Sequence, residues 1–210
     1  MRRSFSRMRH RDRRRAGLLL FAGSIGFAIG MTLAEATFPG YNLAHDFLGD
    51  LGVGPSALLF NASIVFLGAA FLTAAGFLAR AFRVRLLPIS VALAGIGAIG
   101  FGLVPAMDDN PVRMIHAGVA LLAYGGGGLS AILAFRILRP SLRYVSAALG
   151  VISLVGLGLL ATQTWPLDRG VIEQVSVWSI LLWGMTAGGS LLVPSSTSRK
   201  EGVPAGSRGV

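Results

Sequence analysis

The chain has 210 residues, of which 53% are hydrophobic and only 13% are charged. A soluble globular domain carries roughly 25% charged residues, so the composition excludes an ordinary soluble protein and indicates an integral membrane protein. The chain has no cysteine, which excludes disulfides, thiolate nucleophiles and cysteine-bound metals. The formal net charge of +10 would suggest nucleic-acid binding in a soluble protein, but its distribution follows membrane topology, and no nucleic-acid partner is expected.

Both ends of the chain are polar. Residues 1–15 contain eight arginines and precede an apolar run over residues 16–36. A signal peptide also begins with positive charge, but its apolar core is shorter and ends at a small-residue cleavage site. We therefore expect residues 1–15 to be a disordered basic cytoplasmic tail that contacts anionic lipid. Residues 195–210 are rich in Gly, Pro and Ser and are predicted to be a second disordered cytoplasmic tail.

Long apolar runs recur between these tails. Each is long enough to cross the hydrocarbon core of a bilayer, which is about 30 Å thick. The predicted spans cover residues 16–36, 55–79, 86–104, 111–135, 142–162 and 170–193. The predicted fold class is therefore all-α: one polytopic transmembrane bundle of six helices over residues 16–194, with a short amphipathic outer-face helix between the first two.

Small residues predict how these helices pack. They recur every four residues in the first span, and Gly184 and Gly188 do the same in the sixth, a spacing typical of close helix packing. Residues 125–128 are four consecutive glycines. Two interpretations of that run stay open: close packing, or a broken helix of the kind that transporters use.

Charge is divided between the two sides of the predicted membrane domain. Of the 19 basic residues, 17 fall on the side of the termini, and only Arg113 and Arg169 fall on the other. The positive-inside rule therefore predicts a plasma-membrane protein with both termini in the cytoplasm. Seven of the nine acidic residues fall on the outer side, namely Glu35, Asp46, Asp50, Asp108, Asp109, Asp168 and Glu173. Either the outer loops simply use acids as polar residues, or these acids form a shared site.

The segment over residues 41–61 is far more polar than the apolar runs that flank it. On a helix with about 100° per residue, Asn42, His45, Asp46 and Asp50 fall within an arc of about 140°. One interpretation is an interfacial helix whose polar face lies in water. The other is a chemical site, because Asp46 and Asp50 are four residues apart and could bind a divalent cation or share a proton, beside His45 as ligand or base.

Asp50 lies at the end of this predicted helix, where the helix dipole disfavours a carboxylate. We therefore expect Asp50 to accept hydrogen bonds that offset the dipole. The expected donors are the backbone N–H groups of residues 52–56 or a polar group of a neighbouring helix, with His116 as the first choice.

Two further polar groups lie at predicted outer loops. Asp108 and Asp109 precede the fourth span. Asp109 and Asn110 are competing candidates for its N-cap, with Pro111 at its first position. His116 lies more than one turn inside that span, where a functional and a structural role stay equally open. Asp168 is predicted to cap the sixth span, and Glu173 is an early-helix acid that suits the helix dipole.

Established catalytic signatures are missing from the sequence. It has no nucleotide-binding loop, zinc-protease helix, nucleophile elbow or kinase signature. No histidine follows His116. We therefore expect no cofactor and no stoichiometric zinc, and a catalytic role would rest only on clustering of the outer acids and histidines.

Several of these residues also carry a resemblance. They are the run Asp50-Leu51-Gly52 followed by Pro55 and Phe60-Asn61, then His116 and residues 170–173. In these features the chain resembles a prokaryotic family of six-pass membrane proteins known only as a domain of unknown function, which implies a six-helix fold and no particular activity. More distantly, it is similar to the damage-regulated autophagy modulator family, whose relatives act in lipid and lipid-anchor homeostasis.

Three functional hypotheses follow. The first is binding or organising lipid or a partner at the outer leaflet through an acidic and histidine-bearing face, which would require an apolar groove beside the polar residues. The second is a metal-dependent hydrolase or lipid-modifying enzyme, which would require Asp46, Asp50 and His116 to converge. The third is a small transporter. The candidate residues are Asn42, His45, Asp46, Asp50, Asp108, Asp109, His116 and Glu173.

Overall fold

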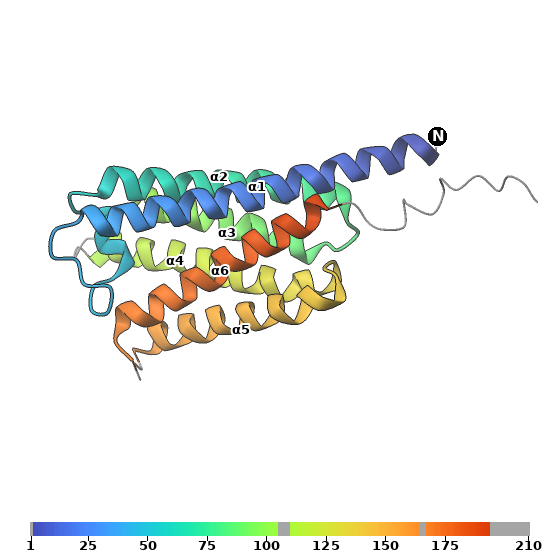
Figure 1. Ribbon diagram of the computed structural model, residues 1–210. Helices are drawn as coiled ribbons and strands as arrows, with labels where there is room; N and C mark the ends of the chain where they lie inside the picture. The colour runs from blue at the N-terminus through green and yellow to red at the C-terminus, as the bar shows by residue number, and fades with distance from the viewer. Residues whose placement is uncertain (1, 105–109, 164–166, 194–210) are drawn as a thin grey trace, which may run out of the picture.

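The fold is a bundle of six long helices (Figure 1). The computed structural model describes residues 2–104, 110–163 and 167–193. The helices are α1 (Arg2–Thr37), α2 (Ala57–Ala81), α3 (Leu86–Leu103), α4 (Asn110–Leu133), α5 (Pro140–Thr162) and α6 (Arg169–Leu192), with short 3-10 helices η1 (Leu48–Gly52) and η2 (Ala134–Arg136). All six long helices have the length and composition to cross a membrane. The chain is a multi-pass membrane protein, as predicted.

The predicted spans end within two residues of the observed helices, except at the N-terminus. There α1 begins at Arg2, contrary to the disordered tail expected for residues 1–15. No glycine or proline precedes residue 17, and arginine is a good helix former, so the helix of the first span continues towards the N-terminus. Its Arg13 guanidinium also donates to the carbonyl oxygens of Ser190 and Val193 at 3.1 and 3.2 Å. Residues 195–210 lie outside the described residues.

The helices pack side by side in chain order, and α1 closes the ring against α6 (Figure 1). Helix α5 lies against α4 and α6 and is the least covered of the six. We call the end that carries the α1–α2, α3–α4 and α5–α6 connections the acidic end; it is at the left of Figure 1. The opposite end, which carries the N-terminal turns of α1 and the α2–α3 and α4–α5 connections, is the basic end.

Reciprocal glycines bring helix backbones into contact. A Cβ atom on Gly17 would lie 2.7 Å from the carbonyl oxygen of Gly188, and one on Gly188 would lie 2.7 Å from that of Gly17. Gly68 of α2 and Gly95 of α3 approach each other in the same way, at 2.6 and 2.7 Å. Side chains at these positions would separate the helices. The close packing predicted for the first and sixth spans is therefore confirmed.

The run of four glycines lies inside an unbroken α4. A Cβ on Gly126 would lie 2.6 Å from Ala94 of α3, one on Gly127 would lie 2.8 Å from Ile180 of α6, and one on Gly128 would lie 2.8 Å from Leu154 of α5. Three neighbouring helices thus approach successive faces of one helical turn. Glycine costs about 1 kcal/mol relative to alanine in a helix, and this packing offsets that cost. The broken-helix interpretation is not needed.

The α1–α2 connection (residues 38–56) is not the amphipathic α-helix that the residue spacing predicts. Residues 43–45 form turns, and the only helix within the connection is η1. The side chains of Asn42 and Asp46 bond to nearby backbone N–H groups, which stabilises turns in competition with helix. Leu48 and Leu51, at 1% and 0% exposure, point into the bundle. The connection therefore folds over the acidic end as a packed cover.

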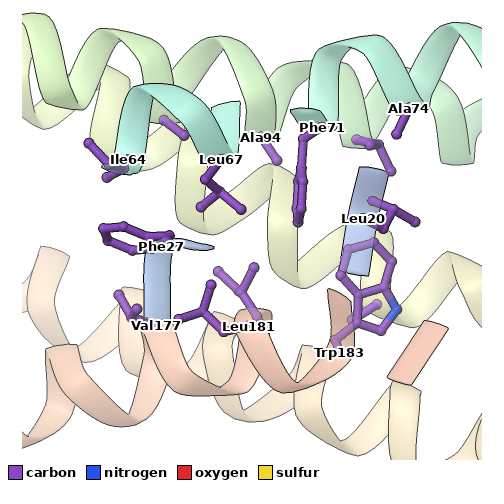
Figure 2. Close-up of a cluster of buried hydrophobic side chains, with 14 of the residues drawn as sticks. Leu20, Phe27, Ile64, Leu67, Phe71, Ala74, Ala94, Val177, Leu181 and Trp183 are labelled. Atoms are coloured by element: carbon purple, nitrogen blue, oxygen red, sulfur yellow. The ribbon is translucent and has the colours of Figure 1, made fainter. Parts of the chain in front are cut away.

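The centre of the bundle is apolar and aromatic (Figure 2). Phe71 of α2 and Trp183 of α6 meet edge to face with ring centroids 6.2 Å apart. Phe27 of α1 meets Phe60 of α2 with centroids 5.7 Å apart. Such edge-to-face pairs contribute beyond the area that they bury. They hold α1, α2 and α6 around the space described below.

Candidate functional site

The acids of the α1–α2 connection close turns. Asp46 accepts from the backbone N–H of Asn42 at 2.8 Å, and Asp50 accepts from that of Phe47 at 2.9 Å. The Asn42 side chain in turn accepts from the N–H of Ala44 at 3.0 Å. The prediction that Asp50 accepts from the backbone of residues 52–56 or from His116 is therefore wrong. A donor on its N-terminal side suits a 3-10 turn that begins at Leu48, where a first-turn acid is favoured rather than disfavoured.

His116 lies apart from these acids and holds the end of α3. Its Nδ1 is 2.8 Å from the carbonyl oxygen of Val104, to which it donates. Its ring packs on Phe101 with centroids 4.4 Å apart. These contacts favour the structural role for His116. Asp108 and Asp109, the remaining candidates before α4, lie outside the described residues.

The α1–α2 connection and the start of α6 are joined by contacts that span the sequence. The backbone N–H of Gly170 donates to the carbonyl oxygen of Ala44 at 2.9 Å, and Arg169 Nε donates to that of His45 at 2.7 Å. The Arg169 guanidinium also stacks on the Phe47 ring, 4.5 Å from its centroid. The N-terminus of α6 is thus the surface on which the connection docks.

His45 and Asp168 form the exposed rim of this docking surface. Their Nδ1 and Oδ2 atoms are 3.5 Å apart, with both side chains more than half exposed. Asp168 occupies the N-cap position of α6, as predicted, but its side chain makes no capping hydrogen bond. An exposed pair of this kind contributes little to stability.

Glu173 is the one candidate acid that the described residues bury almost completely, at 6% exposure. Its Oε2 accepts from the backbone N–H of Leu48 at 2.7 Å, and its Oε1 accepts from the Tyr124 hydroxyl at 3.0 Å. Tyr124 is itself 5% exposed. A buried carboxyl group is costly unless hydrogen-bonded, and here each oxygen has a donor. Glu173 therefore links the α1–α2 connection to α4 through the interior.

Other acids surround Tyr41, which stands at the start of the docked connection. Burial raises the pKa of Tyr41 above its ordinary range, and the carboxylates of Glu35, Glu173, Asp50 and Asp46 raise it further. The Tyr41 hydroxyl is 3.5 Å from the carbonyl oxygen of Phe47 and so stays a neutral donor within the fold. Four of the acids predicted to share one side of the membrane, Glu35, Asp46, Asp50 and Glu173, thus act on one tyrosine at the acidic end.

An apolar cavity lies beneath the docked connection, whose Leu48 lines it. Figure 2 shows Phe27, Val177 and Leu181 on one side of this space and Ile64, Leu67 and Phe71 on the other. The cavity is lined by Phe27, Leu48, Ile64, Leu67, Phe71, Ala94, Ala98, Phe101, Ala123, Tyr124, Val177, Ile180 and Leu181. The space that it encloses is small, about 40 Å³. Because protein interiors are otherwise close-packed, a larger apolar molecule can enter only where these side chains move apart.

The cavity and the buried carboxyl group adjoin each other. Leu48 and Tyr124, the two residues that donate to Glu173, both line the cavity. Val177 and Leu181 follow Glu173 at intervals of four residues along α6, so the cavity runs about 12 Å down that helix from Glu173. The arrangement is an apolar space with a hydrogen-bonded polar group at one end.

The described residues hold no group of three or more His, Asp or Glu side chains placed to bind a metal ion. Asp46 and Asp50 each serve a separate turn, and His116 binds the end of α3. The convergence that the hydrolase hypothesis requires does not occur among these three residues. Sequence reasoning also missed Tyr124 and Tyr41; the signal for Tyr124 was a hydroxyl within an apolar span, which needs a buried partner.

Comparison with known proteins places the chain in a family. Residues 21–189 match the family described as protein of unknown function (DUF998). Because the match covers most of the chain, the chain belongs to this family. No curated protein and no solved structure shows a significant match. The family match shows neither a prokaryotic origin nor the more distant similarity to the damage-regulated autophagy modulator family.

Proposed function

We propose that this DUF998 protein binds one acyl chain of a membrane lipid in the cavity between its helices, at the end of the bundle that the α1–α2 connection covers. The observation that carries the proposal is the position of the cavity. It begins directly under Leu48, is lined by carbon-rich side chains, and has the Glu173–Tyr124 pair at its margin. An elongated apolar molecule with a polar end matches this combination of an apolar lining and a polar margin.

The lining and the surroundings favour a lipid over a polar solute. None of the described residues that line the cavity is charged, so a polar solute would lose its hydration without gaining partners. The helices that enclose the cavity cross the membrane, where the abundant apolar molecules are lipids. An acyl chain also gains dispersion contacts with the phenylalanines and leucines that would otherwise face a void.

Photochemical labelling tests the proposal. The probe is a phosphatidylethanolamine with a diazirine midway along one acyl chain, mixed into nanodiscs that contain the purified protein. After irradiation, mass spectrometry maps the labelled residues. We expect adducts on cavity residues such as Phe27, Tyr124 and Ile180, besides those on lipid-facing residues.

A matched pair of substitutions separates the cavity from the lipid-facing surface. Ala98 lines the cavity at 5% exposure, and Ala69 is an exposed residue of α2. Ala98→Phe should fill the cavity and remove the cavity adducts, whereas Ala69→Phe should leave them unchanged. Wild-type protein labelled only on exposed residues such as Leu58 and Leu121 would contradict the proposal.

For orientation, we propose that the basic end faces the cytoplasm, in the plasma membrane. The support is the concentration of arginines at that end, including Arg80, Arg83 and Arg139, under the positive-inside rule. Single cysteines in this cysteine-free chain test it with an impermeant maleimide on intact cells. Position 50 or 168 should be labelled, and positions 83 and 139 should not. Labelling at 83 without permeabilisation would reverse the orientation.

At the basic end we also propose contact with anionic lipid. Helix α1 extends beyond the other helices there (Figure 1), with Arg9, Arg11 and Arg14 exposed. Near an anionic surface each arginine gains about 1 kcal/mol. Tryptic cleavage of these turns should therefore be slower in nanodiscs that contain phosphatidylglycerol than in zwitterionic ones. Equal cleavage rates in the two would contradict this contact.

A further inference from the structure

The α1–α2 connection closes the cavity at the acidic end, and we infer that it is the gate through which the lipid chain reaches the cavity. Glu173 and Gly170 of α6 hold the gate shut. This inference rests on the proposed function, because it assigns the route and the regulation of the same site. It concerns the contacts between the α1–α2 connection and α6.

Leu48 is the part of the gate that meets the cavity. Its side chain is 1% exposed and lines the space. Every other lining residue belongs to one of the long helices. Moving the connection outwards would therefore open the cavity at this end without unpacking any pair of helices.

Glu173 ties the gate to the wall of the cavity. One oxygen of its carboxyl group accepts from the Leu48 backbone N–H, and the other accepts from the hydroxyl of Tyr124. Leu48 belongs to the gate, and Tyr124 belongs to α4. A single buried side chain thus bonds to both the moving part and the fixed part of the cavity lining, which is the arrangement a latch requires.

Gly170 sets how closely the gate can approach α6. A Cβ atom at this position would lie 2.5 Å, 2.7 Å and 2.6 Å from the carbonyl oxygens of Leu43, Ala44 and Asp46. All three are backbone atoms, so a side chain can be accommodated only if the connection moves away. At the other side of the gate, Gly40 has a φ of +79° and no neighbour within 4 Å of a Cβ. Gly40 is the natural hinge.

The rate of lipid uptake tests the gate. Photoactivatable phosphatidylethanolamine is added to protein in nanodiscs, samples are irradiated at successive times, and the cavity adducts are counted separately from the surface adducts. Gly170→Ala wedges the gate open and should raise the initial rate of cavity labelling by about tenfold or more, the factor that about 1.4 kcal/mol represents. Gly158→Ala is the matched control, because a Cβ on Gly158 meets nothing within 4 Å.

A second pair of variants keeps the test decisive if Gly170→Ala does not fold. Leu48→Ala removes the side chain that lines the cavity but keeps the N–H that Glu173 accepts from, and it should also speed cavity labelling. Leu43→Ala shortens an exposed leucine of the same connection and should not. Hydrogen exchange should rise over residues 43–54 in Gly170→Ala while exchange in the spans stays at the wild-type level.

The outcomes separate the two proposals. Cavity adducts that form at the same rate in wild type, Gly170→Ala and Leu48→Ala would overturn the gate and leave lipid binding in place. The absence of cavity adducts in every variant, wild type included, would overturn lipid binding itself. Faster cavity labelling in Gly170→Ala and Leu48→Ala, but not in their controls, would support both the gate and lipid binding.

Discussion

The two ends of the bundle are held by different forces. At the acidic end, hydrogen bonds join residues far apart in sequence: a buried one joins Glu173 to Leu48, 125 residues apart, and another joins Gly170 to Ala44. At the basic end, exposed arginines gather around one buried acid, Asp12, with Arg80 Nε at 3.5 Å and Arg15 Nη1 at 4.0 Å. Water and salt screen the arginine pairs of the basic end but hardly reach the buried hydrogen bonds of the acidic end.

This difference shows where the molecule can change state. The arginines of the basic end tie helix to helix, as Arg13 of α1 does to the last carbonyl groups of α6. The contacts of the acidic end tie a connection to a helix, over a cavity. Loss of the arginine contacts should loosen the bundle, whereas loss of the contacts at the acidic end should expose the cavity.

Glu173→Ala should change the stability of the acidic end more than any of the substitutions below changes either end. It leaves the Leu48 N–H and the Tyr124 hydroxyl without their acceptor, and each buried unsatisfied group costs about 1–3 kcal/mol. We expect hydrogen exchange over residues 43–54 to accelerate by about tenfold or more, with the basic end unchanged. Tyr124→Phe is the control of graded size, because it removes only the bond to Oε1. Equal exchange in Glu173→Ala and wild type would mean that Glu173 does not hold the connection.

Asp12→Asn tests the other end and should have a smaller effect. Asp12 itself is buried, but its arginine partners are exposed to water, so we expect each pair to contribute close to what a surface pair does, about 1 kcal/mol or less. We expect a fall in melting temperature of a few degrees or less at low salt, which disappears in high salt. The effect of Glu173→Ala should persist at both salt concentrations. If the melting temperature of Asp12→Asn fell equally at low and high salt, the distinction between the two ends would be contradicted.

Asp50→Asn should have a smaller effect still. Asp50 accepts one hydrogen bond, from the Phe47 N–H, on the half-buried side of η1. The asparagine side chain can accept the same bond, so the loss should stay near 0.5–1 kcal/mol, roughly the difference between a charged and a neutral acceptor. Limited proteolysis of residues 43–54 should change less than in Glu173→Ala. Cleavage as fast as in that variant would give Asp50 the role assigned to Glu173.

The smallest effect should come from His45→Gln. The contact between His45 and Asp168 is long and more than half exposed, so its loss should change neither the melting temperature nor exchange over residues 43–54. Arg169 donates to the backbone carbonyl of residue 45, and that bond survives the substitution. A marked change in exchange would place the exposed rim among the contacts that hold the connection.

The spans could be predicted because their signal is local. Twenty or so apolar residues are enough to identify a membrane helix, and the glycine spacing of α1 and α6 indicated close packing. The α1–α2 connection could not be predicted in the same way. The four-residue spacing of Asp46 and Asp50 fits a helix, but their short side chains bind nearby N–H groups and stabilise turns instead.

The candidate site could be predicted only in part, because its contacts are not local. Glu173 was recognisable as an acid early in α6, but its burial depends on Leu48 and Tyr124, which lie in other elements. His116 looked like a partner for Asp50 because both belong to the acidic end. In the fold it binds the carbonyl group of Val104 instead. Sequence places residues at an end of the bundle; packing decides which of them meet.

A density map of the wild-type protein in lipid nanodiscs tests the central claim most directly. We predict elongated non-protein density in the cavity, bordered by Phe27, Tyr124 and Leu181, with the α1–α2 connection closed over it and Leu48 in contact with its end. A well-ordered map with that connection in place and no density in the cavity beyond the protein itself would contradict the claim.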